Sequence, residues 1–129
     1  KSDDGGTNWR PIFDDQTSQS IGSLAIAPSD SNQIWAGTGE AFIRSNVLIG
    51  DGIYKSMDAG ETWQNMGLHD THHIGKVLFH PSNSDVVYVA AQGPLWNGGG
   101  EGSSHSRPLA PSQVRASAFF PPRTALMMM

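Results

Sequence analysis

Two short stretches of the sequence carry most of the residue types that could do acid–base chemistry together. Residues 39–51 include Glu40, Arg44 and Asp51, and residues 67–73 include His69, Asp70, His72 and His73. Glycoside hydrolysis needs two carboxyl groups on either side of a sugar bond, so Glu40 and Asp70 are weak candidates for a catalytic pair. The alternative that we favour for Glu40 is an exposed ion pair with Arg44.

The histidines of the second stretch invite a comparison with metal sites. Three imidazoles within five residues offer enough nitrogen ligands for zinc, but such closely spaced residues of one loop seldom share a tetrahedral geometry. We therefore expect no metal site and no cofactor. Trp96, beside three glycines, could stack on a sugar or could pack as an aromatic residue at a rim. The candidate ligand-binding residues are Glu40, Arg44, His72, His73 and Trp96.

Length and composition exclude several classes of protein. The chain has 129 residues, which is enough for one ordinary domain, and its 15 glycines and 8 prolines argue against a helix bundle. No cysteine is present, so disulfides and thiolate chemistry are excluded. The net charge of −4 argues against a nucleic-acid partner, which would need clustered positive charge. Because no run of eighteen apolar residues occurs, we expect no membrane insertion.

The elements that must position these residues are indicated by an internal repeat. Residues 21–39, IGSLAIAPSDSNQIWAGTG, align with residues 74–92, IGKVLFHPSNSDVVYVAAQ, at an offset of 53. Residues 2–9, SDDGGTNW, align with residues 56–63, SMDAGETW, at an offset of 54. Two independent matches at nearly one period indicate that the chain repeats one structural unit.

One period contains four stretches with the residue pattern of short strands. They are residues 21–27, 33–38, 52–56 and 62–66, separated by Pro-Ser and Asp-Ala-Gly turns. Four antiparallel strands in each period of this length are typical of a β-propeller blade. The sequence therefore predicts an all-β fold of roughly two blades, which is an incomplete propeller. A two-sheet sandwich is the less favoured alternative, because sandwiches need not repeat their sequence.

The octapeptide SMDAGETW resembles the Asp-box, or bacterial neuraminidase repeat, with the pattern Ser/Thr-x-Asp-x-Gly-x-Thr-Trp. The matching residues are Ser56, Asp58, Gly60, Thr62 and Trp63, and in the first copy Ser2, Asp4, Gly6 and Trp9. The first copy has Asn8 where threonine is usual. We expect Asp58 to hold its own turn by accepting backbone N–H bonds rather than to act in catalysis. Gly60 supplies a positive φ, and Trp63 covers the hairpin.

Residues 1–102 as a whole resemble the propellers of sortilin-type and xyloglucanase-type glycoside hydrolase proteins. The segments that carry this resemblance are IWAGTGEAFIRSNVLIGDGIYKSMDAGETW and HHIGKVLFHPSNSDVVYVAAQGPLW. The family pattern stops at Ser103, so we divide the chain into blades at 1–102 and an atypical tail at 103–129. That tail is either disordered or a substitute strand, for which Phe119 and Phe120 are the candidates.

The resemblance implies a function for the two loop stretches. In a propeller, the loops 39–51 and 67–73 would lie on one face beside the central channel, where these folds usually bind ligands. We expect a scaffold that binds a glycan or a peptide there; the alternative is a xyloglucanase-like hydrolase remnant. Enzymatic activity is uncertain, because two blades would ordinarily lack half of a catalytic pair. The resemblance also implies a secreted or periplasmic protein, and two blades imply a homo-oligomer or a part of a larger propeller.

Overall fold

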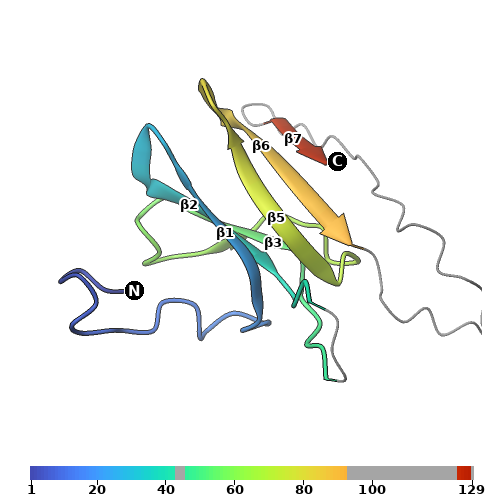
Figure 1. The fold of residues 1–129 in the computed structure, drawn as a ribbon, viewed down its shortest axis with the longest axis horizontal. Coiled ribbons are helices and arrows are strands. Elements are labelled where there is room, and N and C mark those ends of the chain that lie inside the picture. Colours follow the sequence, from blue (N-terminus) through green and yellow to red (C-terminus); the bar gives the residue numbers. More distant parts are fainter. Residues whose placement is uncertain (43–45, 93–124, 129) are drawn as a thin grey trace, which may run out of the picture.

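The computed structural model describes residues 1–42, 46–92 and 125–128, and every regular element in them is a strand (Figure 1). The strands are β1 (Ile21–Ala27), β2 (Asp30–Thr38), β3 (Ile53–Ser56), β4 (Gln64–Asn65), β5 (His73–His80), β6 (Asn83–Gln92) and β7 (Ala125–Met128). The predicted all-β class is confirmed for these residues. They contain no helix, and thus none that is long and apolar enough to cross a membrane.

The strands form two sheets. The first has the order β1-β2-β3-β4, with every neighbouring pair antiparallel. In the second, β5 pairs with β6 antiparallel, and β7 lies parallel to the other edge of β6. The remaining tail residues 103–124 and 129 lie outside the described residues, and so do Phe119 and Phe120.

The two long hairpins, β1–β2 and β5–β6, turn in the same way. In each, a Pro-Ser pair forms the bend, and the next side chain fixes the start of the following strand. Asp30 Oδ1 accepts a hydrogen bond from the Asn32 backbone N–H at 3.0 Å. Asn83 Oδ1 accepts the corresponding bond from Asp85 at 2.9 Å. These Asx turns satisfy a backbone donor that the tight bend leaves unpaired.

The strand pairing repeats with the 53-residue spacing of the sequence. Leu24 faces Ala36 across β1–β2, as Val77 faces Val89 across β5–β6. The irregularities repeat as well. The first hairpin shifts register between Ile21 and Ser23 and between Ile26 and Ala27; the second shifts between Ile74 and Lys76 and between Phe79 and His80. Each residue of the second hairpin named here lies 53 positions after its counterpart, so both hairpins have one local structure.

The core lies between the two sheets, with β5 packed against β1 and β2 (Figure 1). Its buried members are Trp35 and Ile53 of the first sheet and Ile74, Val77, Val87, Val89 and Ala91 of the second. Ser23 Oγ accepts a hydrogen bond from the Val77 backbone N–H at 3.0 Å, which links the sheets directly. Gly37 lies against the Ile74 and Val77 side chains, because it leaves room for them.

Three of the predicted strands have different bounds in the structure, β3 by only one residue at its start. The last strand of the first sheet covers only Gln64–Asn65, because the backbone N–H of Thr62 bonds to the Asp58 carboxylate instead of to a strand. Strand β2 begins at Asp30, three residues earlier than predicted, since the pairing already starts between Ala27 and Asp30.

Candidate functional site

The turn 56–63 joins β3 to β4 and is held by one carboxylate. Asp58 Oδ1 accepts hydrogen bonds from the Thr62 backbone N–H and from Ser56 Oγ, both at 2.8 Å. Its other oxygen accepts the Thr62 hydroxyl at 2.5 Å. Ser56 Oγ in turn accepts the Gly60 backbone N–H at 2.8 Å. Both carboxylate oxygens are therefore engaged within the turn, which leaves Asp58 poorly placed for chemistry on a ligand.

The turn 2–9 has the same internal bonds. Asp4 accepts the Asn8 backbone N–H at 2.9 Å, and Ser2 Oγ accepts the Gly6 N–H at 2.8 Å. The Asn8 side-chain amide donates to the second Asp4 oxygen at 2.6 Å, as the Thr62 hydroxyl does in the other turn. Asparagine thus replaces threonine without loss of a hydrogen bond.

Ion pairs join the two turns. The Arg10 guanidinium binds the Glu61 carboxylate through both terminal nitrogens, and Lys1 Nζ lies 3.7 Å from the same carboxylate. The Trp63 indole N–H donates to the Ile12 carbonyl at 2.7 Å, and the indole ring meets Phe13 edge-on at 5.0 Å. Residues that follow the first turn therefore cover the second turn.

Replacing Asp58 by alanine should lower the thermal midpoint by several degrees, because three hydrogen bonds of the turn lose their acceptor. Those bonds, first of all that from the Thr62 hydroxyl, lower the pKa of Asp58 to about 2. Since the unfolded carboxyl binds a proton more readily, this stabilisation is present above pH 4 and is lost as the pH falls toward 2. Thermal melts of Asp58→Ala between pH 2 and 7 measure both effects. Asp4→Ala, in the exposed turn, is the matched control with the smaller loss, and an unchanged midpoint for Asp58→Ala would rule the turn role out.

At the opposite end of the first sheet, one backbone bond ties loop 39–51 to loop 67–73, and two more anchor and close the first loop. The Gly50 N–H donates to the His72 carbonyl at 2.8 Å, and the Gly39 N–H donates to the Ser20 carbonyl at 2.8 Å. The Glu40 N–H closes the first loop onto the Leu48 carbonyl at 3.1 Å. The two loops that the sequence places on one face therefore share a fixed base.

Asp51 is the centre of a side-chain network on this loop face. Its carboxylate lies 2.7 Å from His69 Nδ1 and accepts the Tyr54 hydroxyl at 2.9 Å. The bond to His69, with that from Tyr54, lowers the pKa of Asp51. Because an ionised carboxylate can only accept, His69 Nδ1 carries the proton of this bond, and Nε2 is the second polar atom of the ring. His69 is exposed, so the loop face offers an oriented imidazole to solvent.

The other candidate residues of the loops have different surroundings. His73 is buried at the start of β5, its Nδ1 has no hydrogen-bond partner among the described residues, and burial lowers its pKa. A ligand contact by His73 stays a prediction that this burial disfavours. His72 is half-buried with its ring 6.1 Å from that of His73, Asp70 is exposed, and Glu40 is half-buried. Arg44 and Trp96 lie outside the described residues.

On the described part of loop 39–51 three apolar side chains are exposed, and the acid–base reasoning missed them. They are Phe42, 86 % exposed, with Leu48 and Ile49. The Ile49 carbonyl accepts a hydrogen bond from the Ser18 hydroxyl at 3.2 Å, which holds the backbone of this part of the loop while the apolar side chains face solvent. The sequence signal was available, because a loop rarely combines these residues without a packing partner or a ligand.

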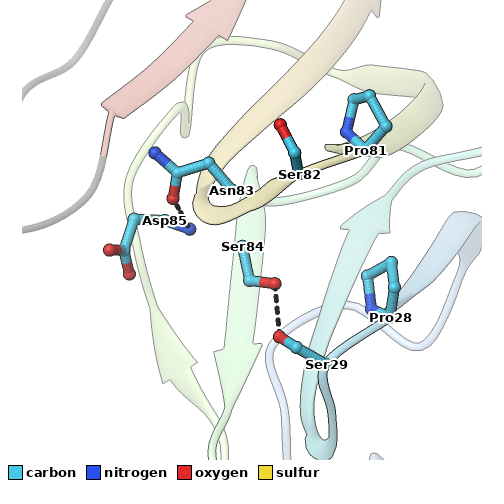
Figure 2. A pocket seen from close by; sticks show the side chains of 7 residues that line it. All are labelled: Pro28, Ser29, Pro81, Ser82, Asn83, Ser84 and Asp85. Atoms are coloured by element: carbon cyan, nitrogen blue, oxygen red, sulfur yellow. Dashed lines mark hydrogen bonds between the residues drawn. The ribbon is translucent and has the colours of Figure 1, made fainter.

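A shallow depression lies between the two Pro-Ser turns, at the end of the sheets opposite the loop face. It is lined by Pro28, Ser29, Pro81, Ser82, Asn83, Ser84 and Asp85 (Figure 2). Ser29 and Ser84 bond to one another across it at 2.6 Å, and the buried Gln33 donates its amide to the Ser84 carbonyl at 3.3 Å. These bonds link the turns of the two hairpins.

Across residues 1–42 and 46–92, no three histidine or carboxylate side chains converge in a way that could hold a metal ion. Comparisons with protein-family models, with curated proteins and with solved structures found no match to this chain.

Proposed function

We propose that the chain is part of a β-propeller that binds a peptide on the loop face formed by residues 39–51 and 67–73. The observation that carries this proposal is the exposure of Phe42, Leu48 and Ile49 on a loop whose base is anchored. Apolar side chains on an anchored loop can accept apolar side chains of a ligand without a large ordering cost. The oriented imidazole of His69 beside them adds a polar contact.

The two-blade interpretation is supported by the repeated hairpins. Both have the same pairing and the same register shifts, and the second packs on the first in sequence order. A propeller is built by such repetition of one sheet, whereas a sandwich does not require it. The resemblance of the turns to Asp-boxes agrees with this interpretation, and with it a secreted or periplasmic location.

A peptide is favoured over a glycan because two of the three exposed residues are aliphatic. Sugar sites rely on flat aromatic faces and polar side chains, and Phe42 is the one aromatic residue exposed on the described part of these loops. Hydrolysis of glycosides is the second candidate function, for which Glu40 and Asp70 would supply the carboxyl groups.

Peptide and glycan arrays probed with the intact chain test the proposal. We expect binding to apolar peptides that falls about tenfold in Leu48→Ser, because a buried leucine contact is worth roughly 1.5–3 kcal/mol. Met57→Ser removes a similarly exposed apolar side chain from the turn 56–63 and is the matched control with unchanged binding. Binding to glycans alone, or equal losses in both variants, would contradict peptide binding on this face. Turnover of chromogenic glycosides that disappears in Glu40→Gln or Asp70→Asn would favour the hydrolase.

A further inference from the structure

The second sheet packs on the first, and this stack has two outer faces. Each outer face corresponds, at an offset of 53 residues, to a sheet face that is packed inside the chain. Val77 and Phe79 of β5 lie against the first sheet, Val77 being 1 % exposed and Phe79 packed at the edge of the core. Their counterparts 53 residues earlier, Leu24 and Ile26 of β1, are 61 % and 59 % exposed. The same face is therefore covered in the second hairpin and open in the first.

The turns 2–9 and 56–63 show the same difference between a covered copy and an exposed copy. Trp63 is half-buried, with Ile12 and Phe13 of the preceding segment against it. Its counterpart Trp9 is 75 % exposed, although its indole N–H makes a local bond to the Gly6 carbonyl. Three apolar side chains at the N-terminal end of the stack thus lack the cover that their counterparts have.

The opposite end of the stack carries the complementary face. Inside the chain, Val77 and its neighbours pack on a face of the first sheet formed by Ala25 and Trp35. The counterparts of Ala25 and Trp35 are Leu78 and Tyr88, which pair with one another on the outer side of β5–β6. Leu78 is 46 % exposed. Each end of the stack therefore presents a copy of one partner in the internal sheet contact.

We propose that the Leu24–Ile26 face of one chain binds the Leu78 face of a second copy, in the way that the two sheets pack within one chain. The contact joins unlike surfaces, so it is heterologous, and a pair of chains joined in this way keeps one free face of each kind. Association of this kind continues until a ring closes or a filament forms.

Residues 1–20 leave room for this contact. Phe13 of that segment covers Tyr54 on the same side of the first sheet, with ring centres 5.1 Å apart, but Leu24 and Ile26 stay exposed beside it. On the partner's face, Lys76 stands where Ser23 stands in the internal contact. Its long aliphatic stem can lie on the apolar surface while the ammonium group reaches the rim.

Sedimentation velocity over a range of concentrations tests the proposal with two charge variants. The unmodified chain should form species larger than a monomer, and their share should grow with concentration. Leu24→Glu and Leu78→Glu should each lower the association constant at least about tenfold, because each places a charge in an apolar contact. Both positions are exposed in the monomer, so both variants should fold, which circular dichroism checks.

A mixture of the two variants gives the decisive test of the proposal. Leu24→Glu keeps an intact Leu78 face and Leu78→Glu keeps an intact Leu24 face, so a mixture should form heterodimers that grow no further. Met57→Glu, on an exposed position away from both faces, should associate like the unmodified chain. The proposal is overturned if the unmodified chain stays monomeric, if neither variant changes the association, or if mixing restores nothing.

Discussion

Replacing Gly39 by alanine is expected to lower the free energy of unfolding by about 3 kcal/mol or more and to separate loop 39–51 from loop 67–73. Gly39 has φ +86°, a conformation that L-residues rarely adopt. A Cβ there would overlap the His72 carbonyl oxygen and would lie 3.0 Å from the Gly50 nitrogen. Those two atoms form the bond that ties loop 39–51 to loop 67–73, so neither can move without breaking it.

Gly67→Ala separates the two causes of this loss, which are the strain of a positive φ and the overlap of the new Cβ with neighbouring atoms. Gly67 has φ +102°, but a Cβ at that position would meet no other atom within 4 Å. It therefore measures the backbone strain alone, about 1–2 kcal/mol. Chemical denaturation of both variants, with hydrogen exchange at Gly50 as a local probe, gives the comparison. Equal losses in the two variants would show that the close approach of the loops at Gly39 is not tight.

Trp35→Ala is expected to cost about 3–5 kcal/mol of folding free energy, which is a large part of the stability of a domain of this size. Trp35 is fully buried between the two sheets, where it belongs to the cluster that includes Val77 and Val89. Lys55 Nζ also lies over its ring at 5.5 Å from the centre. Truncation removes the largest side chain of the core and leaves a cavity that rigid strands on both sides cannot fill.

Trp35→Phe is the matched control. The Trp35 indole nitrogen is buried and has no hydrogen-bond partner among the described residues. Phenylalanine removes that unpaired donor along with some volume, so the two effects partly offset each other and the loss should be well below that of alanine. Urea unfolding followed by far-UV circular dichroism measures both variants. A small loss for Trp35→Ala would mean that the sheets do not pack on this side chain.

Local patterns predicted the hairpins well, because their signals are contained in a few neighbouring residues. The Pro-Ser bends and the Asx turns at Asp30 and Asn83 act over two or three positions, and the 53-residue offset carried the prediction from one hairpin to the other. The short β4 was harder, since the same Thr62 N–H can serve either a strand or a turn carboxylate. Sequence alone does not say which of the two partners takes it.

The alternation of side chains along β1 and β5 does not reveal which face of each strand is covered by another sheet. Leu24 and Val77 have equivalent positions in the pattern, yet one is exposed and the other is buried, because burial depends on what precedes each hairpin in the stack. The candidate site was likewise predicted only in part. The sequence placed Asp51 and His69 on one face, but their 2.7 Å pairing across 18 residues depends on how the loops close. The exposed Phe42 was not among the residues that the sequence singled out, although its apolar side chain in a loop was visible there.

The chain stacks two copies of one hairpin unit with their turns side by side. Ser29 of the first turn and Ser84 of the second have hydroxyl oxygens 2.6 Å apart (Figure 2). The chain contains no cysteine, so the double variant Ser29→Cys/Ser84→Cys has one possible intramolecular disulfide. At high dilution under mild oxidation, we predict that this disulfide forms in nearly all molecules and stabilises the fold by roughly 2–4 kcal/mol. Thiols that stay reduced, or that link only separate chains, would contradict the stacked arrangement.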